Sequence, residues 1–331
     1  MDDHPLDFRS DTVTKPTQAM RAAMIDAEVG DDIYGEDPTI RALEEHTADL
    51  FGFHAAMFVP TGVMANHIGV RLLVHPGGEL VCDADAHIIA YEDGGLAWHG
   101  GIQTRTTLND QGLLAPADLR RLIRPTTSAV EVENTHNRGG GAVYPIETLR
   151  EIRALADETG VKVHMDGARI WNAHAATGVP LRDYGAIADT MSVCLSKGLG
   201  APVGSVLMFA PERAAEARQM RHRLGGGWRQ AGMLAAAGRY ALDHHVERLT
   251  QDHANAALLA DGLHEAGFAV RPPQTNIVLV EVPDAPALAA AFAARGVLVA
   301  VFGPGLLRLV THLDVSEKDC VEAVTVARQL I

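Results

Sequence analysis

The stretch "TMSVCLSKGLGAPVGSVLMF", residues 190–209, places a single lysine between two apolar runs. The first run, Met191 to Leu195, has the apolar character of a buried strand. Ser196 and Lys197 follow it directly, and glycines then lead into a second strand-like run at 204–209. The low-dielectric surroundings of a buried strand disfavour a charged amine and make it a nucleophile toward a carbonyl group. The stretch therefore predicts a functional site at a strand end.

The same pattern of strands continues outward from this stretch. Strand-like runs alternate with helical patterns such as "IETLREIRALADETG" and are found at 54–59, 79–82, 128–133 and 161–165. A further helix is expected to begin at Asp37 as N-cap, with Pro38 in its first turn. This alternation predicts an α/β fold with a largely parallel sheet.

The pattern changes beyond about residue 248. Strand-like runs at 275–282, 297–301 and 306–310 surround a helix expected near 285–295, and a last helix is expected to be capped at Ser316. We predict a large domain over 1–248, including an N-terminal arm, and a small C-terminal α+β domain over 249–331.

The composition excludes several classes of protein. The chain has 331 residues, 47% hydrophobic and 21% charged, which suits a globular enzyme with a large core. A net charge of −14 argues against nucleic acid as a partner. The three widely spaced cysteines indicate a reduced compartment, and the acidic segment 1–16 lacks the apolar core of a signal peptide. With no apolar stretch long enough for a membrane span, a cytoplasmic location is expected.

Polar residues gather where the predicted strands end. These positions are "PTG" at 60–62, "DADAH" at 83–87, "ENTHN" at 133–137, "DGAR" at 166–169 and "SKG" at 196–198. Ligands of open parallel sheets bind beyond the carboxyl ends of the strands, so all five should meet at one site. The turn at Thr61 and Gly62 opens a helix, whose free N–H groups suit a phosphate. Together with Lys197 and Asp166, it points to pyridoxal 5′-phosphate, which needs a lysine and an acidic partner for its ring nitrogen.

Each of these features alone has a commoner explanation. A lone lysine after a strand is usually a solvated loop residue, and a Thr-Gly turn commonly just connects a strand to a helix. Asp166 and Arg169 are spaced as a local ion pair, and His87 and His136 fit core or loop positions equally well. The acidic residues at 83–87 lack an accompanying HExxH motif or Cys/His cluster, so no metal is expected. The prediction depends on their joint occurrence in this order.

Eight blocks occur along the chain in this order: "FRSDTVTKPT", "VGDDIYGEDP", "PTGVMAN", "ENTHNRGGG", "HMDGARIWNA", "CLSKGLGAPVGS", "GGGWRQAG" and "RLVTHLDVS". In these blocks and their order, the chain resembles the threonine aldolase family of fold-type I pyridoxal phosphate enzymes. The blocks run from residue 8 to residue 316 and thus cover nearly the whole chain.

The resemblance implies a role for each motif residue. Lys197 would carry the Schiff base with the cofactor and Asp166 would pair with the ring nitrogen. His87 would stack on the ring, and His136 would approach the β-hydroxyl of the substrate. The remaining cofactor contacts would come from Thr61, Gly62, Val63, Ser196, Arg169 and Arg229, and the remaining substrate contacts from Ser10, Tyr34, Arg169 and Arg308.

The resemblance also implies an assembly and a reaction. Arg229 would reach the phosphate of a neighbouring subunit, within a homotetramer built as a dimer of dimers with shared active sites. The expected reaction is retro-aldol cleavage of L-threonine or L-allo-threonine to glycine and acetaldehyde, with His87 or His136 as general base, directly or through water. A β-eliminating lyase, an amino-acid racemase and an inactive cofactor-binding protein remain as alternatives.

Three positions depart from the family pattern. Val63 stands where a small polar residue is usual, which removes a side-chain bond to the phosphate but keeps the backbone donor. His222 stands where lysine is common and Trp228 where methionine is common. We therefore expect cofactor binding to be kept, whereas substrate preference is not fixed by the resemblance.

Overall fold

The computed structural model of the protein describes residues 5–330. Residues 1–4 and 331 lie outside the described residues. They contain the outer ends of the two predicted domains and the start of the acidic N-terminal segment, so these parts of the predictions are not described by the structure.

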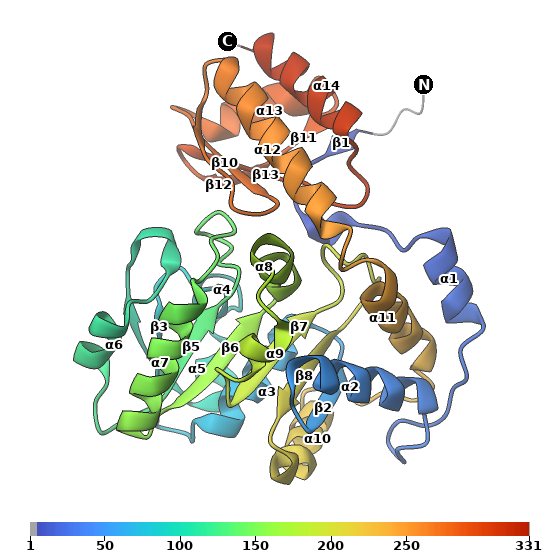
Figure 1. Ribbon diagram of the computed structural model, residues 1–331, viewed down its shortest axis with the longest axis vertical. Coiled ribbons are helices and arrows are strands. Elements are labelled where there is room, and N and C mark those ends of the chain that lie inside the picture. Colours follow the sequence, from blue (N-terminus) through green and yellow to red (C-terminus); the bar gives the residue numbers. More distant parts are fainter. Residues whose placement is uncertain (1–4, 331) are drawn as a thin grey trace.

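A seven-stranded sheet forms the centre of the larger part of the molecule (Figure 1). Its strands, in spatial order, are β2 (Ala55–Val59), β8 (Ser205–Phe209), β7 (Thr190–Cys194), β6 (Lys162–Gly167), β5 (Thr127–Glu133), β3 (Glu79–Asp83) and β4 (Gln103–Thr107). Only β8 runs against its neighbours; it pairs antiparallel with both β2 and β7. The predicted α/β fold with a largely parallel sheet is confirmed.

Helices cover both faces of this sheet because its strands are apolar on both sides. Met57, Val59, Leu207 and Phe209 pack on one face against α3 (Gly62–Leu73) and α10 (Ala214–Arg223). The alternate residues of the same strands join the core on the other face. That face is covered by α2 (Pro38–Phe51), α7 (Ile146–Thr159), α9 (Leu181–Gly185) and α11 (Gly232–His244).

The predicted start of α2 is confirmed. The Asp37 side chain accepts hydrogen bonds from the backbone N–H groups of Thr39 at 3.1 Å and Ile40 at 3.0 Å. These bonds satisfy two of the free donors of the first turn.

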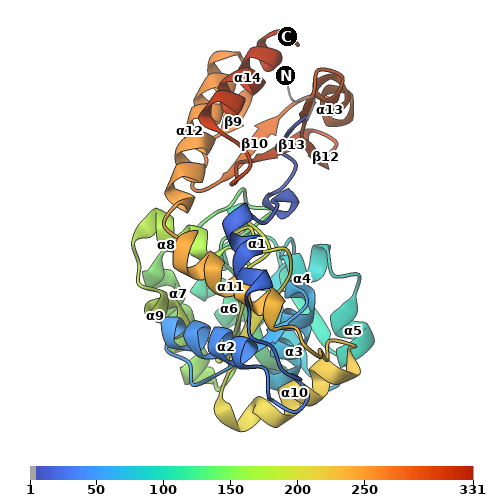
Figure 2. The same ribbon diagram turned by 90° about the vertical axis from the view of Figure 1, so that its right-hand side faces the viewer.

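A second, four-stranded antiparallel sheet lies at the other end of the molecule (Figure 2). Its spatial order is β12 (Ala300–Gly303), β13 (Leu306–Val310), β10 (Ile277–Glu281) and β9 (Ala269–Arg271). It has its own core with α12 (Leu249–Glu265), α13 (Ala285–Ala293) and α14 (Glu317–Arg328). Ser316 caps α14, as predicted, and forms a capping box with Asp319.

The N-terminal segment connects the two sheets. Its strand β1 (Leu6–Asp7) pairs parallel with β11 (Val297–Leu298) beside the small sheet. The chain then forms α1 (Gln18–Ile25), which packs on α11 beside the large sheet. The remaining short helices are α4 (His87–Ala90), α5 (Gly95–Gly100), α6 (Pro116–Leu122), α8 (Ile170–Thr177) and 3-10 turns at Asp11–Val13, Asp110–Gly112 and Pro211–Arg213. Among the described helices, none is long and apolar enough to cross a membrane.

Candidate active site

The carboxyl ends of β2, β3, β5, β6 and β7 lie at the same edge of the large sheet, because these five strands are parallel to one another. Side chains beyond these ends contact each other directly. Asn66 Nδ2, on the helix after β2, donates to Asp166 Oδ2 at 2.7 Å, and the His87 backbone N–H, after β3, donates to Glu133 Oε2 at 2.7 Å. The predicted convergence of strand ends is confirmed.

Asp166 is held firmly at the end of β6. Its side chain is buried, and its second oxygen, Oδ1, accepts from the Ala168 backbone N–H at 2.9 Å. Donors on both oxygens fix the orientation of the carboxylate.

Lys197 lies in the half-buried loop after β7, next to half-buried Ser196. Its carbonyl oxygen accepts hydrogen bonds from Thr14 Oγ1 at 3.0 Å and from the Gly200 backbone N–H at 2.8 Å. The N-terminal segment therefore helps to hold the loop that carries the lysine.

The first turn of α3 has the geometry of an anion site. Thr61 is its N-cap and accepts from the Met64 N–H at 3.1 Å, while the N–H groups of Gly62 and Val63 have no partner within the helix. A Cβ on Gly62 would lie 2.9 Å from Cys194 Sγ, so glycine is required for the helix to begin this close to β7. The helix is twelve residues long, and its dipole adds to the attraction for an anion.

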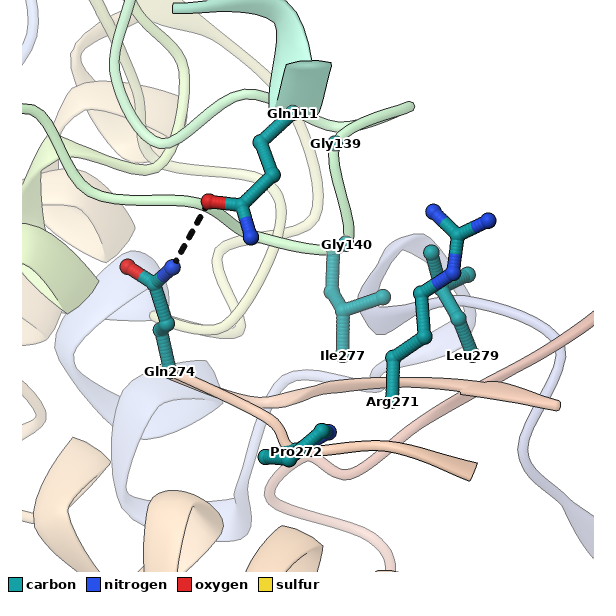
Figure 3. A pocket seen from close by; sticks show the side chains of 8 residues that line it. All are labelled: Gln111, Gly139, Gly140, Arg271, Pro272, Gln274, Ile277 and Leu279. Atoms are coloured by element: carbon teal, nitrogen blue, oxygen red, sulfur yellow. Dashed lines mark hydrogen bonds between the residues drawn. The ribbon is translucent and has the colours of Figure 1, made fainter. Parts of the chain in front are cut away.

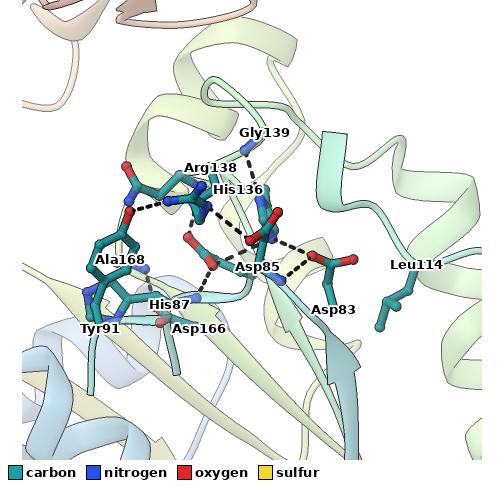
Figure 4. A network of polar contacts seen from close by, with 12 residues as sticks. Asp83, Asp85, His87, Tyr91, Leu114, His136, Arg138, Gly139, Asp166 and Ala168 are labelled. Carbon is teal, nitrogen blue, oxygen red and sulfur yellow. Dashed lines mark hydrogen bonds and ion pairs between the residues drawn. The ribbon is translucent and has the colours of Figure 1, made fainter. Parts of the chain in front are cut away.

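His87 opens α4 and is partly buried, with 25% of its side chain exposed. Its Nδ1 lies 2.8 Å from Glu92 Oε1 (the ring is labelled in Figure 4). Burial lowers the pKa of His87, but the contact with Glu92 and the charge of Asp166 outweigh it and raise the pKa above its ordinary value. Because Glu92 only accepts, Nδ1 carries the proton and Nε2 of the neutral ring is free to accept one.

His136 is fully buried and has the opposite tautomer. Its Nδ1 accepts from the Gly139 backbone N–H at 3.0 Å, so the neutral ring carries its proton on Nε2. Nε2 lies 3.6 Å from Asp83 Oδ1 and 3.8 Å from Glu133 Oε2, and it makes no hydrogen bond (Figure 4).

Arg169 contacts Asp11 and not Asp166, so the local ion pair suggested by sequence spacing is absent. Its Nε and Nη2 donate to the two oxygens of Asp11 at 2.8 and 2.7 Å, and both side chains are buried. Burial opposes the charge on Asp11, but Arg169 outweighs it and holds the pKa of that carboxyl well below its usual range.

Arg308 lies close to Arg169. Its guanidinium donates to Asn137 Oδ1 at 2.7 Å and to the Arg9 carbonyl at 2.9 Å, and lies 4.4 Å from the centre of the Phe302 ring. Burial, followed by the charge of Arg169, lowers the pKa of Arg308 to about 10. Two crowded guanidiniums with only Asp11 between them favour the binding of a further anion.

The other predicted residues, Ser10, Tyr34 and Arg229, lie outside the cluster of side chains at the strand ends. Ser10 caps a 3-10 turn, with its Oγ 3.4 Å from Asp11 Oδ1, and so lies at the edge of the arginine pair. Tyr34 is 77% exposed, and the Arg229 side chain is 65% exposed and 3.4 Å from Asp31. Within the described chain, neither Tyr34 nor Arg229 contacts the strand-end cluster.

Several site residues were not assigned from sequence. Asn66 lies within the block "PTGVMAN", and Asp11 lies within "FRSDTVTKPT". Glu92 follows His87 by five residues, a spacing without a known signal. His87, Glu92 and Asp166 place ligand atoms within 4.8 Å of one another, but the Asn66 amide donates to both carboxylates and so fills the position between them.

Two adjoining hollows lie between the strand-end loops and the small sheet. One, of about 320 Å³, is lined by Gln111, the Gly139–Gly140 loop and Arg271, with Gln274 Nε2 donating to Gln111 Oε1 at 3.2 Å across it (Figure 3). The other, of about 380 Å³, reaches His136. Both lie on the side of His136 that faces the small sheet.

The chain matches known proteins in sequence over most of its length. Residues 7–285 match the family described as beta-eliminating lyase. The chain is 42% identical over 326 residues to the low specificity L-threonine aldolase of Escherichia coli (strain K12), covering 96% of each protein. It is 40% identical over 334 residues to low-specificity L-threonine aldolase 1 of Arabidopsis thaliana, covering 95% of this chain and 93% of the other.

Solved structures share its fold. The threonine aldolase of Leishmania major superposes with a TM-score of 0.85 at 20% identity, covering 98% of this chain and 99% of the other. The serine palmitoyltransferase of Sphingomonas wittichii superposes with a TM-score of 0.77 at 19% identity, covering 98% and 86%. The predicted fold type I architecture is confirmed.

Proposed function

The chain belongs to the low-specificity L-threonine aldolase family, and from this membership we propose that it is a pyridoxal 5′-phosphate-dependent lyase that cleaves L-threonine or L-allo-threonine to glycine and acetaldehyde. The observation that carries the proposal is the meeting of Asp166, Lys197, His87 and the first turn of α3 at one edge of the sheet.

The residues at this edge fit the cofactor. Lys197 would hold it covalently, Asp166 would face its ring nitrogen, and the turn at Thr61, Gly62 and Val63 would hold its phosphate. Asp166 suits this role because two donors fix the orientation of its carboxylate, and Gly62 lets the helix begin close to β7. When bound, pyridoxal phosphate supplies a sink for the electrons released as the Cα–Cβ bond breaks.

The substrate carboxylate would be bound by Arg169 and Arg308. The Asp11 pair orients Arg169, and Arg308 keeps its Nε without a partner in the described chain. A carboxylate held by two guanidiniums fixes the rotation of the amino acid, and this geometry selects which bond at Cα breaks. Ser10 would contribute at the edge of this clamp.

His87 is the better candidate for the general base. Its Nδ1 is occupied by Glu92, which leaves Nε2 free to take the proton of the β-hydroxyl. His136 in its neutral form carries a proton on Nε2, so it suits donation of a hydrogen bond to the aldehyde oxygen that forms.

The proposal also includes the assembly of subunits, the boundary between the two domains and the cellular location. The Asp32 backbone N–H donates to the Arg229 carbonyl at 3.2 Å, which places exposed Ile33 and Tyr34 close to Arg229, and exposed Met233 follows four residues later. Such an apolar surface with an arginine suits a subunit contact, which supports shared sites in a homotetramer. Two separate cores support a domain boundary near residue 248, with the exception that Phe8 of the N-terminal arm is buried in the core of the small domain. Three buried free cysteines support a reducing, cytoplasmic location.

The function is tested by incubating the purified, cofactor-loaded protein with each of the four threonine stereoisomers and measuring glycine and acetaldehyde. We expect product from the L isomers only. Formation of 2-oxobutanoate from threonine would support a β-eliminating lyase, and conversion of L- to D-threonine a racemase. Cofactor binding without any product would support an inactive binding protein.

A further inference from the structure

Glu92 lies at the centre of a buried polar cluster next to the proposed base. It follows α4, and none of its side chain is exposed. One oxygen, Oε1, is 2.8 Å from His87 Nδ1 and accepts from Asn66 Nδ2 at 2.9 Å. Burial would raise the pKa of Glu92, but the contacts of His67, His87 and Asn66 outweigh it and lower the pKa to about 2. Glu92 is therefore a charged acceptor at neutral pH.

Asn66 links this carboxylate to the one proposed to face the cofactor. Its Nδ2 donates both to Glu92 and, at 2.7 Å, to Asp166. Its Oδ1 accepts from Ser192 Oγ at 2.6 Å and lies 3.2 Å from His164 Nε2, so the orientation of the amide is determined by four partners. A neutral amide between two carboxylates reduces their repulsion and fixes the distance between them.

His67 occupies the second oxygen of Glu92. Its Nε2 lies 2.9 Å from Oε2. The ring is 8% exposed and lines a hollow of about 310 Å³ that is also lined by Glu92 and by Thr61 and Val63 of the turn proposed to hold the phosphate. Glu92 thus lies between a histidine that reaches the surface and the histidine at the site.

Other charged groups also act on His87. Glu133 from β5 accepts from its backbone, while Asp166 from β6 and Lys197 after β7 act on its pKa in opposite directions. Arg71 and Arg223 border the neighbouring hollow on the far side of His67. Among these groups, only Glu92 contacts the His87 ring nitrogen in the described chain.

We propose that Glu92 is a positioning residue for the reaction: its carboxylate holds His87 in the tautomer that leaves Nε2 free, and Asn66 ties the same carboxylate to Asp166. This inference deepens the proposed function and rests on it for the role of His87. Glu92 would act on His87 as the buried aspartate of a Ser-His-Asp triad acts on its histidine: it holds one ring nitrogen and leaves the other, Nε2, free to accept a proton.

The test is a titration of His87 by NMR in the full chain, labelled with ¹³C and ¹⁵N in histidine. His87→Gln assigns the signal, and the ¹⁵N shifts report the tautomer. We expect Glu92→Gln to lower the pKa of His87 by about one to three units and to mix its tautomers, because the charge on its partner is lost. In the loaded enzyme, the acidic limb of kcat/KM should move down by the same amount, and kcat should fall about tenfold or more with KM little changed.

Glu131→Gln is the matched control. Glu131 is equally buried and lies near enough to act on Glu92 and Asp166, but it does not contact His87. Burial, then Glu133 and Asp166, raise the pKa of Glu131 well above its ordinary value. This control should leave the titration of His87 unchanged.

His67→Leu provides a second variant, on the surface side of Glu92, should Glu92→Gln fail to fold. Removing the competing ring leaves more of the Glu92 charge to His87, so the pKa of His87 should rise. The proposal would be overturned if the pKa of His87 were unchanged in Glu92→Gln, or if it changed equally in Glu131→Gln. Where only His67→Leu folds, a His87 pKa that does not rise in that variant would also overturn it. The titration is also run without cofactor, so its result does not depend on the proposed function. If Glu92→Gln lowers the pKa of His87 but the wild-type protein makes no glycine, the positioning role is supported and the aldolase function is rejected.

Discussion

Asp11 and Arg169, 158 residues apart in the chain, form a buried ion pair with two hydrogen bonds of 2.7 and 2.8 Å. The pair joins the N-terminal segment to the loop after β6. It therefore holds both the proposed carboxylate-binding guanidinium and the segment that contacts the Lys197 loop through Thr14.

Replacing Asp11 by Ala should destabilise the protein by about 3–5 kcal/mol, because Arg169 would be left charged and buried without its partner. Urea unfolding at pH 7 measures this loss. Arg9→Ala is the control, since Arg9 pairs with Asp7 at the surface and such pairs contribute little. A midpoint for Asp11→Ala equal to that of Arg9→Ala would contradict the prediction.

The same pair predicts an acid dependence of stability. The pKa of Asp11 is lower in the folded protein than in the unfolded chain, so its contribution is complete above the unfolded value of about 3.9. The contribution is lost as the pH falls below that value toward the folded pKa. Wild-type and Asp11→Ala proteins should therefore differ less in unfolding free energy at pH 3 than at pH 7.

Lys197 is expected to be the residue that binds the cofactor covalently. Borohydride treatment of the loaded protein should attach the cofactor to the peptide that contains Lys197, and Lys197→Ala should lose turnover while still binding the cofactor noncovalently. Lys162→Ala is the control, because Lys162 lies at the surface beside Asp189. Attachment to any other lysine would refute the assignment.

Arg229 is expected to complete the site of a neighbouring subunit. Arg229→Ala should weaken cofactor affinity, measured by titration of the apoprotein. A mixture of Arg229→Ala and Lys197→Ala proteins should regain activity after subunit exchange, because one site of each mixed dimer contains both residues. If the mixture is no more active than its separate components, then Arg229 acts within its own chain.

Glu131 should make the protein less stable as the pH rises. Its carboxyl is buried on β5, and neither oxygen has a hydrogen-bond partner in the described chain. Since its pKa is higher in the folded protein than in the unfolded chain, folding becomes less favourable above the unfolded value of about 4.3, by about 1.4 kcal/mol per pH unit, until the folded pKa is reached.

Glu131→Gln removes this titration. Its melting temperature should therefore exceed that of the wild type by more at pH 8 than at pH 5. Glu158→Gln tests the specificity of the effect, because Glu158 lies at the surface beside Arg120 and should show no such pH dependence. A gain that is the same at both pH values would show that Glu131 does not titrate on folding.

Local sequence was enough to predict most of the strands and the helices with clear N-caps or periodicity, such as α2, α7 and α14. Asp37 and Ser316 cap helices through side chains that bond within three residues, and buried strands such as β7 are continuous apolar runs. In the large sheet, the strand that was not predicted is β4, "QTRTT"; the short strands β1 and β9 and most of the other helices were not predicted either. As an edge strand with mostly exposed residues, β4 lacks the apolar pattern on which the prediction depends.

The sequence alone also placed the polar residues at strand ends, because strand order along the chain and a parallel sheet together bring those ends to one edge. The reversal of β8 and the contacts within the site were decided only by the tertiary structure. Asn66 meets Asp166 across 100 residues, and Asp11 meets Arg169 across 158. Such pairs depend on how helices and loops pack against the sheet, and local propensity does not encode contacts between residues so far apart in the sequence. Glu92 likewise acquires its role from its burial and from the donors that surround it.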